Sequence, residues 1–219
     1  MDSYERYLEI KNSVPDDVTI VAVSKTRSIE DMEGAYRAGA RIFGENKVRE
    51  LIGKYDSFHE DVQWHLIGHL QRNKVKYLVG KVDLIQSLDS VTLLNEIEKQ
   101  FGKEKIIANT LIEINIGSEE SKAGVLLNDL ESLLVEVEKC QYVKVRGLMA
   151  IIPKGDEESN RYYFKKVKEL YERLQKKDFK NIIMSTLSMG MSGDYDIAIS
   201  EGANMIRIGE GIFGKRNYK

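Results

Sequence analysis

Short apolar segments alternate with amphipathic helical segments along nearly the whole chain. Eight apolar segments are expected to form strands, near residues 18–24, 41–43, 62–67, 82–86, 106–116, 143–149, 182–187 and 204–208. Helical patterns fill the intervals, near residues 28–38, 45–56, 72–79, 90–101, 126–139, 157–177 and 192–201, and another helix is expected at about 3–13. Gly39, Gly102 and Gly202 stand where three helices are expected to end. Strands joined by helical crossovers run parallel, so the pattern predicts an all-parallel sheet.

A parallel sheet of this kind has two common solutions, a closed (β/α)8 TIM barrel and an open doubly wound sheet. The number of strands and the lack of a linker rich in proline and glycine favour the barrel. The chain has 219 residues, fewer than the roughly 250 typical of this fold. We therefore expect short loops and one domain over residues 1–219, with no second domain.

Charge and composition narrow the classes of partner. The 33 Lys and Arg residues nearly balance the 35 Asp and Glu residues, so no basic field favours nucleic acid or an anionic membrane. The N-terminal segment is charged and lacks an apolar signal core, and no apolar run is long enough to span a bilayer. The single cysteine, Cys140, cannot form an internal disulfide. We expect a cytoplasmic protein with no nucleic-acid or membrane partner.

The first strand ends in Ser24-Lys25-Thr26. A lysine at the edge of an apolar sheet loses hydration, so its pKa should fall and its neutral amine could form Schiff bases with carbonyls. The alternative is a lysine that simply reaches into water from the end of a strand. In a parallel barrel all strand C-termini open onto one face, where active sites lie. The other strand ends therefore decide between the two interpretations.

The segments after the seventh and eighth strands indicate an anion site. They read Ser188-Met189-Gly190-Met191-Ser192 and Gly209-Glu210-Gly211-Ile212-Phe213-Gly214, and loops at these two positions often bind phosphate in this fold. The second segment matches G-x-G-x-x-G, but no βαβ unit follows, so we expect a glycine turn near a phosphate and not a dinucleotide site. Ser192 could instead be only a helix N-cap. Arg207, at the tip of the eighth strand, could meet an anion or form an ion pair in the core.

Other signals are weaker. His65 and His69 are four residues apart but lack the helix and glutamate of a metalloprotease motif, so we expect no metal site. Glu45 could be a general base or could cap the helix that follows it.

The motifs at the strand ends occur together and in a specific order. They are Val23-Ser24-Lys25, Phe43-Gly44-Glu45-Asn46, the segment 64–74 (WHLIGHLQRNK), the segment 187–192 (LSMGMS), and Arg207-Ile208-Gly209 with Ile212-Phe213-Gly214. In this order they resemble the pyridoxal phosphate homeostasis protein family (YggS/PROSC type) over nearly the whole chain. Leu66 replaces the Phe or Met usual in that family, and Glu210 replaces a hydroxyl residue. The Glu210 side chain is therefore expected to point away from the phosphate.

The resemblance implies a barrel of the alanine-racemase type (fold type III) that holds pyridoxal 5′-phosphate, PLP, as a Schiff base on Lys25. It implies a phosphate site at Ser188-Met189-Gly190 and at Gly209-Glu210-Gly211. It further implies Arg207 beside the pyridine nitrogen, Asn46 near the ring, and His69 and Met189 lining the pocket. Family members act in the homeostasis of this vitamin B6 cofactor without an established reaction. PLP-dependent apoenzymes as recipients and a monomeric state are expectations of the same origin.

The residues also bear on catalysis. An arginine cannot give its proton to the pyridine nitrogen, so Arg207 would leave the ring a poor electron sink. The chain has no residues for the second domain of the racemases and no evident second base. We therefore expect a carrier or regulator. The alternative is a small racemase or lyase-type enzyme with Lys25 as one base and His69 or Tyr195 as the other. A Schiff-base aldolase acting on a phosphosugar is a third reading.

Overall fold

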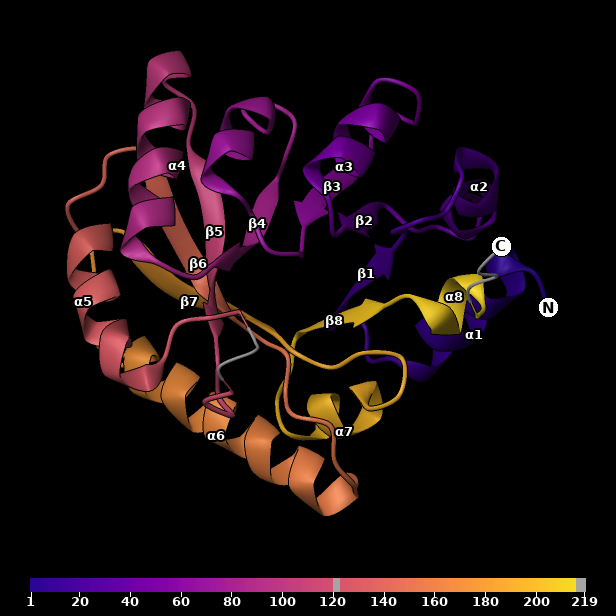
Figure 1. Ribbon diagram of the computed structural model, residues 1–219. Helices are drawn as coiled ribbons and strands as arrows, with labels where there is room; N and C mark the ends of the chain where they lie inside the picture. The colour runs from indigo at the N-terminus through magenta and orange to yellow at the C-terminus, as the bar shows by residue number, and fades with distance from the viewer. Residues whose placement is uncertain (120–122, 216–219) are drawn as a thin grey trace.

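The computed structural model describes residues 1–119 and 123–215. Within them eight parallel strands close into a barrel in which each strand pairs with its neighbours in the sequence, and β8 pairs with β1. The strands are β1 (Thr19–Val23), β2 (Ile42–Glu45), β3 (Gln63–Leu66), β4 (Leu84–Leu88), β5 (Ala108–Ile114), β6 (Val143–Ala150), β7 (Ile182–Ser188) and β8 (Met205–Ile208). Figure 1 shows the helices arranged around these strands. The predicted barrel is confirmed, and the open sheet is excluded.

The helices follow the predicted alternation, with three differences. They are α1 (Ser3–Ser13), α2 (Ile29–Arg37), α3 (Val48–Tyr55), α4 (Val91–Glu104), α5 (Leu127–Val137), α6 (Glu157–Gln175), α7 (Tyr195–Ser200) and α8 (Glu210–Phe213), with a 3₁₀ helix η1 (Arg72–Tyr77) between β3 and β4. Among the described residues, no helix is long and apolar enough to cross a membrane.

The first difference is η1, which we expected to be an ordinary helix. It buries only Val75, so it lacks the apolar stripe that stabilises an α-helix. The second is Gly102, which does not end its helix. The helix continues to Glu104 and stops at Lys105, which adopts the left-handed conformation with φ 56°. A Cβ on Gly102 would lie 2.9 Å from the Tyr142 ring, so the glycine makes room for that side chain.

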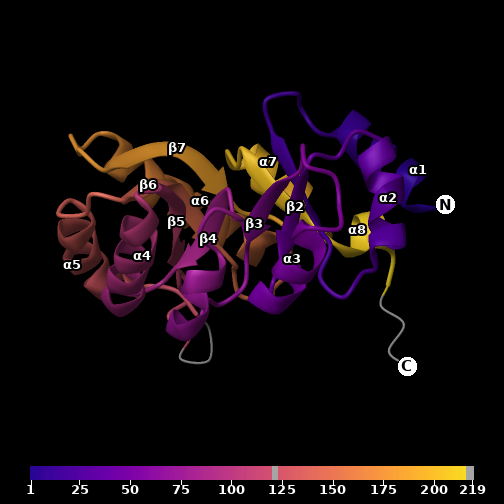
Figure 2. The same ribbon diagram turned by 90° about the horizontal axis from the view of Figure 1, so that it is seen from above.

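The third difference is α8, a single turn where we expected only a glycine turn. Such a short helix cannot cover the seam between β8 and β1. The N-terminal helix α1, which occupies the predicted range, packs against both α2 and α8 and buries Tyr7 and Ile10. Figure 1 and Figure 2 agree that α1, α2 and α8 lie together at one side of the barrel. The N-terminal helix α1 thus covers the side of the barrel that a longer eighth helix would otherwise cover.

The core has two parts. The larger lies between strands and helices and includes Phe43 and Trp64. The smaller consists of Val21, Leu84, Leu111, Met149 and Met205. Because side chains along a strand alternate between faces, Leu84 shares its face with Gln86, Leu111 with Glu113 and Met205 with Arg207. All three of the polar residues are buried. The barrel interior therefore changes from apolar to polar toward the carboxyl ends of the strands.

Substitution of Gly147 tests how closely the backbones of β6 and β7 approach each other. Its φ is +149°, and an added Cβ would lie 1.7 Å from the backbone oxygen of Thr186. Gly147→Ala should therefore lower the free energy of unfolding by about 3 kcal/mol. Gly53 in α3 is the matched control, because its Cβ would meet nothing within 4 Å. Gly53→Ala should stabilise the helix by about 0.5–1 kcal/mol. Urea denaturation measures both, and equal stability of the two variants would contradict the prediction.

Candidate functional site

A cavity of about 550 Å³ opens at the carboxyl ends of the strands. Four of the predicted site residues line it, namely Lys25, Asn46, Arg207 and Gly209. Its other lining residues are Val23, Arg27, Ile67, Ile151, Lys154, Met191, Ser192, Gly193 and Glu210. The wall therefore combines apolar side chains with four cations, a composition that suits a small anionic ligand with an apolar body.

Lys25 lies half-buried in the loop that follows β1. The next residue, Thr26, adopts a left-handed conformation with φ 64°, which is uncommon for a β-branched residue. Its N–H donates to Glu50 Oε2 of α3 at 2.7 Å. The carboxylate of α3 thereby holds a strained backbone in place and fixes where the Lys25 amine emerges.

A buried polar cluster of Ser24, Glu45 and Lys54 lies immediately before this loop. Lys54 Nζ donates to Glu45 Oε1 at 2.6 Å and to the Ser24 carbonyl at 2.8 Å. The Ser24 hydroxyl donates to the same Glu45 oxygen at 2.7 Å. Burial raises the pKa of Glu45, and the charge of Lys54 opposes that rise. Glu45 is thus neither of the two alternatives that the sequence allows, a helix cap or a general base. It is the partner of a buried cation.

Arg207 ends a second buried chain of hydrogen bonds. Its Nη1 donates to Ser188 Oγ at 2.8 Å, and Ser188 donates in turn to Gln86 Oε1 at 2.7 Å. The Gln86 amide nitrogen lies 3.0 Å from His65 Nδ1. Burial lowers the pKa of His65 to about 3, so the ring is neutral and Nδ1 accepts the bond. The three hydrogen bonds therefore run in one direction, from Arg207 to the neutral ring of His65.

The charge of Arg207 is balanced at longer range. Its guanidinium also donates to the Ala150 carbonyl at 2.9 Å, so its hydrogen bonds go to a hydroxyl and a carbonyl and not to a carboxylate. Burial lowers its pKa to about 10, while Glu113 and Asp194 oppose that shift. Burial, with help from Asp89, raises the pKa of Glu113 to about 7. The barrel interior thus keeps Arg207 cationic and leaves its charge available to the cavity.

Ser192 occupies a small cradle of backbone N–H groups. Its Oγ accepts from the N–H of Gly209 at 3.3 Å and from that of Gly211 at 3.1 Å. Two N–H groups that converge on one oxygen are the arrangement that binds phosphate oxygens. The N-cap of α7 is Asp194 and not Ser192, which removes the simpler explanation for this serine.

The remaining predicted residues lie elsewhere. Ser188 points into the barrel beneath Arg207, and Gly190 accepts from the Arg207 backbone N–H at 3.0 Å. Met189 is fully buried in the main core, so its side chain cannot line the cavity. His69 has an exposed side chain whose Nδ1 lies 3.1 Å from Asp89 Oδ2, and it lines a neighbouring hollow. Neither side chain therefore lines the cavity that contains Lys25, and a role of Met189 or His69 in ligand binding stays a prediction.

The other candidate for a second base, Tyr195, also lies away from the cavity. Tyr195 Oη lies 3.5 Å from Ser13 Oγ, so the phenol faces α1 and not the cavity. Sequence reasoning missed Arg27 and Lys154 as cations of the cavity. Lys154 belongs to an irregular segment with no motif, and only its place after β6 could have pointed to it.

Comparisons with known proteins agree on one relationship. The family model for the alanine racemase N-terminal domain matches residues 4–217. A pyridoxal phosphate homeostasis protein of Aquifex aeolicus is 44% identical over 201 residues, which are 91% of this chain and 87% of that protein. PipY of Synechococcus elongatus, solved with PLP bound, superposes with a TM-score of 0.89 at 33% identity over 97% of this chain and all of PipY. An alanine racemase of Clostridium difficile shares the fold, with a TM-score of 0.82 at 14% identity over 58% of its length.

The buried pair of Lys54 and Glu45 gives a pH-dependent prediction. Lys54→Met should destabilise the chain by about 3–5 kcal/mol at pH 8, because it leaves a buried carboxylate without a cation beside it. A carboxyl whose folded pKa is raised loses folding stability as the pH rises from its unfolded toward its folded pKa. The destabilisation should therefore be smaller at pH 4, where Glu45 is protonated. Urea denaturation at both pH values measures this.

The double variant Glu45→Gln with Lys54→Met is the control, because the neutral amide can still accept from Ser24. At pH 8 it should be more stable than Lys54→Met alone. The interpretation fails if the destabilisation of Lys54→Met does not change with pH.

Proposed function

Because the chain belongs to the family of pyridoxal phosphate homeostasis proteins, we propose that it binds PLP in the cavity at the mouth of the barrel, as a Schiff base on Lys25, and acts in the homeostasis of this cofactor. The observation that carries the proposal is the convergence of three groups on one cavity. They are the Lys25 amine, the Arg207 guanidinium and the N–H groups gathered at Ser192.

The donor set fits such a ligand. The N–H groups of Gly209 and Gly211, together with the Ser192 hydroxyl, form a place for phosphate oxygens, and Arg27 and Lys154 add positive charge nearby. Val23, Ile67 and Ile151 supply apolar surface for a ring. The fit includes four of the residues predicted from sequence and adds Ser192 to them.

Binding and release follow from the chain's own groups. When bound, the cofactor supplies an aldehyde that a lysine amine takes up reversibly. Arg207, whose pKa of about 10 keeps it protonated at neutral pH, donates hydrogen bonds but does not give up a proton to a nitrogen beside it. A pyridine nitrogen beside Arg207 would therefore stay unprotonated, and the pyridine ring would withdraw electrons less strongly. The geometry therefore supports a carrier or regulator over an enzyme, because His69 and Tyr195 also lie outside this cavity.

The finer parts of this function are also proposals. We take PLP-dependent apoenzymes as the recipients, the cytoplasm as the compartment and the monomer as the working state. The exposed Glu210 at the rim is not assigned to phosphate binding.

Covalent trapping tests the role of Lys25. After saturation with PLP and reduction with borohydride, peptide mass mapping should find a pyridoxyl adduct on the peptide that contains Lys25. Lys25→Ala should lose that adduct. Lys154→Ala is the matched control, because Lys154 lines the same cavity, and it should retain the adduct. Absence of the adduct from the Lys25 peptide in saturated protein would overturn the proposal.

Isotope exchange separates carrier from enzyme. The loaded protein, incubated with a panel of α-deuterated L-amino acids, should leave the α-deuterium in place over many protein equivalents, as measured by mass spectrometry. Lys25→Ala gives the background rate. Sustained loss of deuterium that depends on Lys25 would instead establish a racemase or lyase-type activity.

A further inference from the structure

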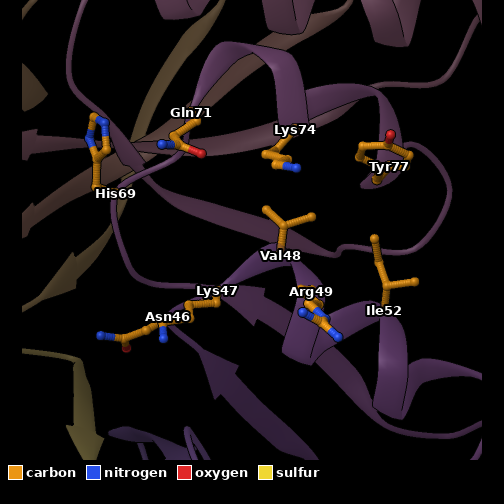
Figure 3. Close-up of a pocket in the computed structure, with 9 residues that line it drawn as sticks. All are labelled: Asn46, Lys47, Val48, Arg49, Ile52, His69, Gln71, Lys74 and Tyr77. Atoms are coloured by element: carbon orange, nitrogen blue, oxygen red, sulfur yellow. The ribbon is translucent and has the colours of Figure 1, made fainter.

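A second cavity, of about 650 Å³, lies beside the first, between α3 and η1. It is lined by Asn46, Lys47, Val48, Arg49, Ile52, His69, Gln71, Lys74 and Tyr77. Figure 3 shows the residues of α3 on one wall and Gln71, Lys74 and Tyr77 on the other. Its volume is within the range of small-molecule sites, roughly 300–1,000 Å³. Nothing in the proposed function uses it.

Its polar wall is cationic. Lys47, Arg49 and Lys74 all line it, and none of its lining residues is acidic. Over residues 1–119 and 123–215, none of these three cations forms an ion pair, whereas other surface cations such as Lys81 and Arg161 do. Three unneutralised charges around one hollow concentrate positive potential there.

The first turn of α3 adds to this potential. Lys47 is the N-cap of that helix and supplies no side-chain acceptor, because an ammonium group can only donate. The N–H groups of the first turn, which includes Val48 and Arg49, are therefore without the usual side-chain cap, at the end of the helix that favours anions. Both residues line the cavity.

Part of the lining is apolar and includes one aromatic ring. Val48, Ile52 and Tyr77 contribute this part, and Tyr77 is 46% exposed. Lys74 Nζ lies 5.8 Å from the centre of the Tyr77 ring, so a cation and an aromatic surface stand side by side. This pairing suits a ligand that joins an anionic group to a planar body.

We propose that this cavity is a second binding site, for a small phosphate ester with a flat apolar body. Lys47, Arg49 and Lys74 bind the phosphate together with the first turn of α3, and Tyr77, Val48 and Ile52 contact the body. Asn46 lines both cavities, so the two sites adjoin. PLP belongs to the same chemical class, and the site then holds a second cofactor molecule next to the first; this last step rests on the proposed function.

Calorimetry on the full chain tests the site. The chain is loaded with PLP and reduced with borohydride, so that the Lys25 cavity is filled covalently, and is then titrated with pyridoxine 5′-phosphate, which has no aldehyde. One equivalent should bind. Phenyl phosphate should bind as well, because the class and not the vitamin is recognised, and inorganic phosphate should bind about ten-fold more weakly because it has no planar body. Where no adduct forms, the proposed function fails, and the unmodified chain is titrated instead.

Single variants locate the binding. Lys74→Ala and Arg49→Ala, on opposite walls, should each weaken binding about ten-fold. Arg72→Ala is the matched control, because Arg72 belongs to the same η1 helix but not to the cavity lining, and it should leave affinity unchanged. Thermal unfolding checks that all variants fold. The inference is overturned if no ester binds, if inorganic phosphate binds as tightly, or if Arg72→Ala weakens binding as much as Lys74→Ala does.

Discussion

The buried guanidinium of Arg207 is the constraint on which the barrel interior near the carboxyl ends of the strands depends. An unpaired buried charge would cost several kcal/mol, on the order of 3–5, so the interior must supply acceptors. It does so through Ser188, Gln86 and His65, which form a chain of hydrogen bonds with one direction from the cation to a neutral ring. Deep burial keeps His65 neutral, with its pKa lowered to about 3. These four side chains therefore form one hydrogen-bonded unit beneath the cavity.

A second buried cluster performs the same task outside the barrel wall. Lys54 ties Glu45 of β2 to the Ser24 carbonyl, so α3, β2 and the end of β1 are held together. The two units meet because β1 pairs with β8, with Val21 opposite Arg207. Arg207 is thus positioned within β8, and Lys25 is positioned by the end of β1 together with the contact of the following loop to α3.

Sequence reasoning predicted the barrel because apolar periodicity and strand number are global properties of the chain. It also predicted Lys25 and Arg207 at one face, since strand ends share it, and both residues line the cavity there. It failed where the direction of one side chain decides the matter. Ser188 and Met189 are neighbours, yet one points into the barrel and the other into the outer core. Both segments were expected at one anion site, but the hydrogen bonds from Gly209 and Gly211 to Ser192 could not be predicted, because they join two loops.

The helix α3 connects these elements in a way that no single motif indicates. Its last turn carries Lys54, which is buried against Glu45, and its first turn carries Glu50, which holds the Thr26 backbone next to Lys25. Its first turn, with Arg49, lines the second cavity, and the preceding Asn46 borders both cavities. The helix therefore contacts the buried ion pair, the loop of Lys25 and the second cavity at once, so one element helps to position all three.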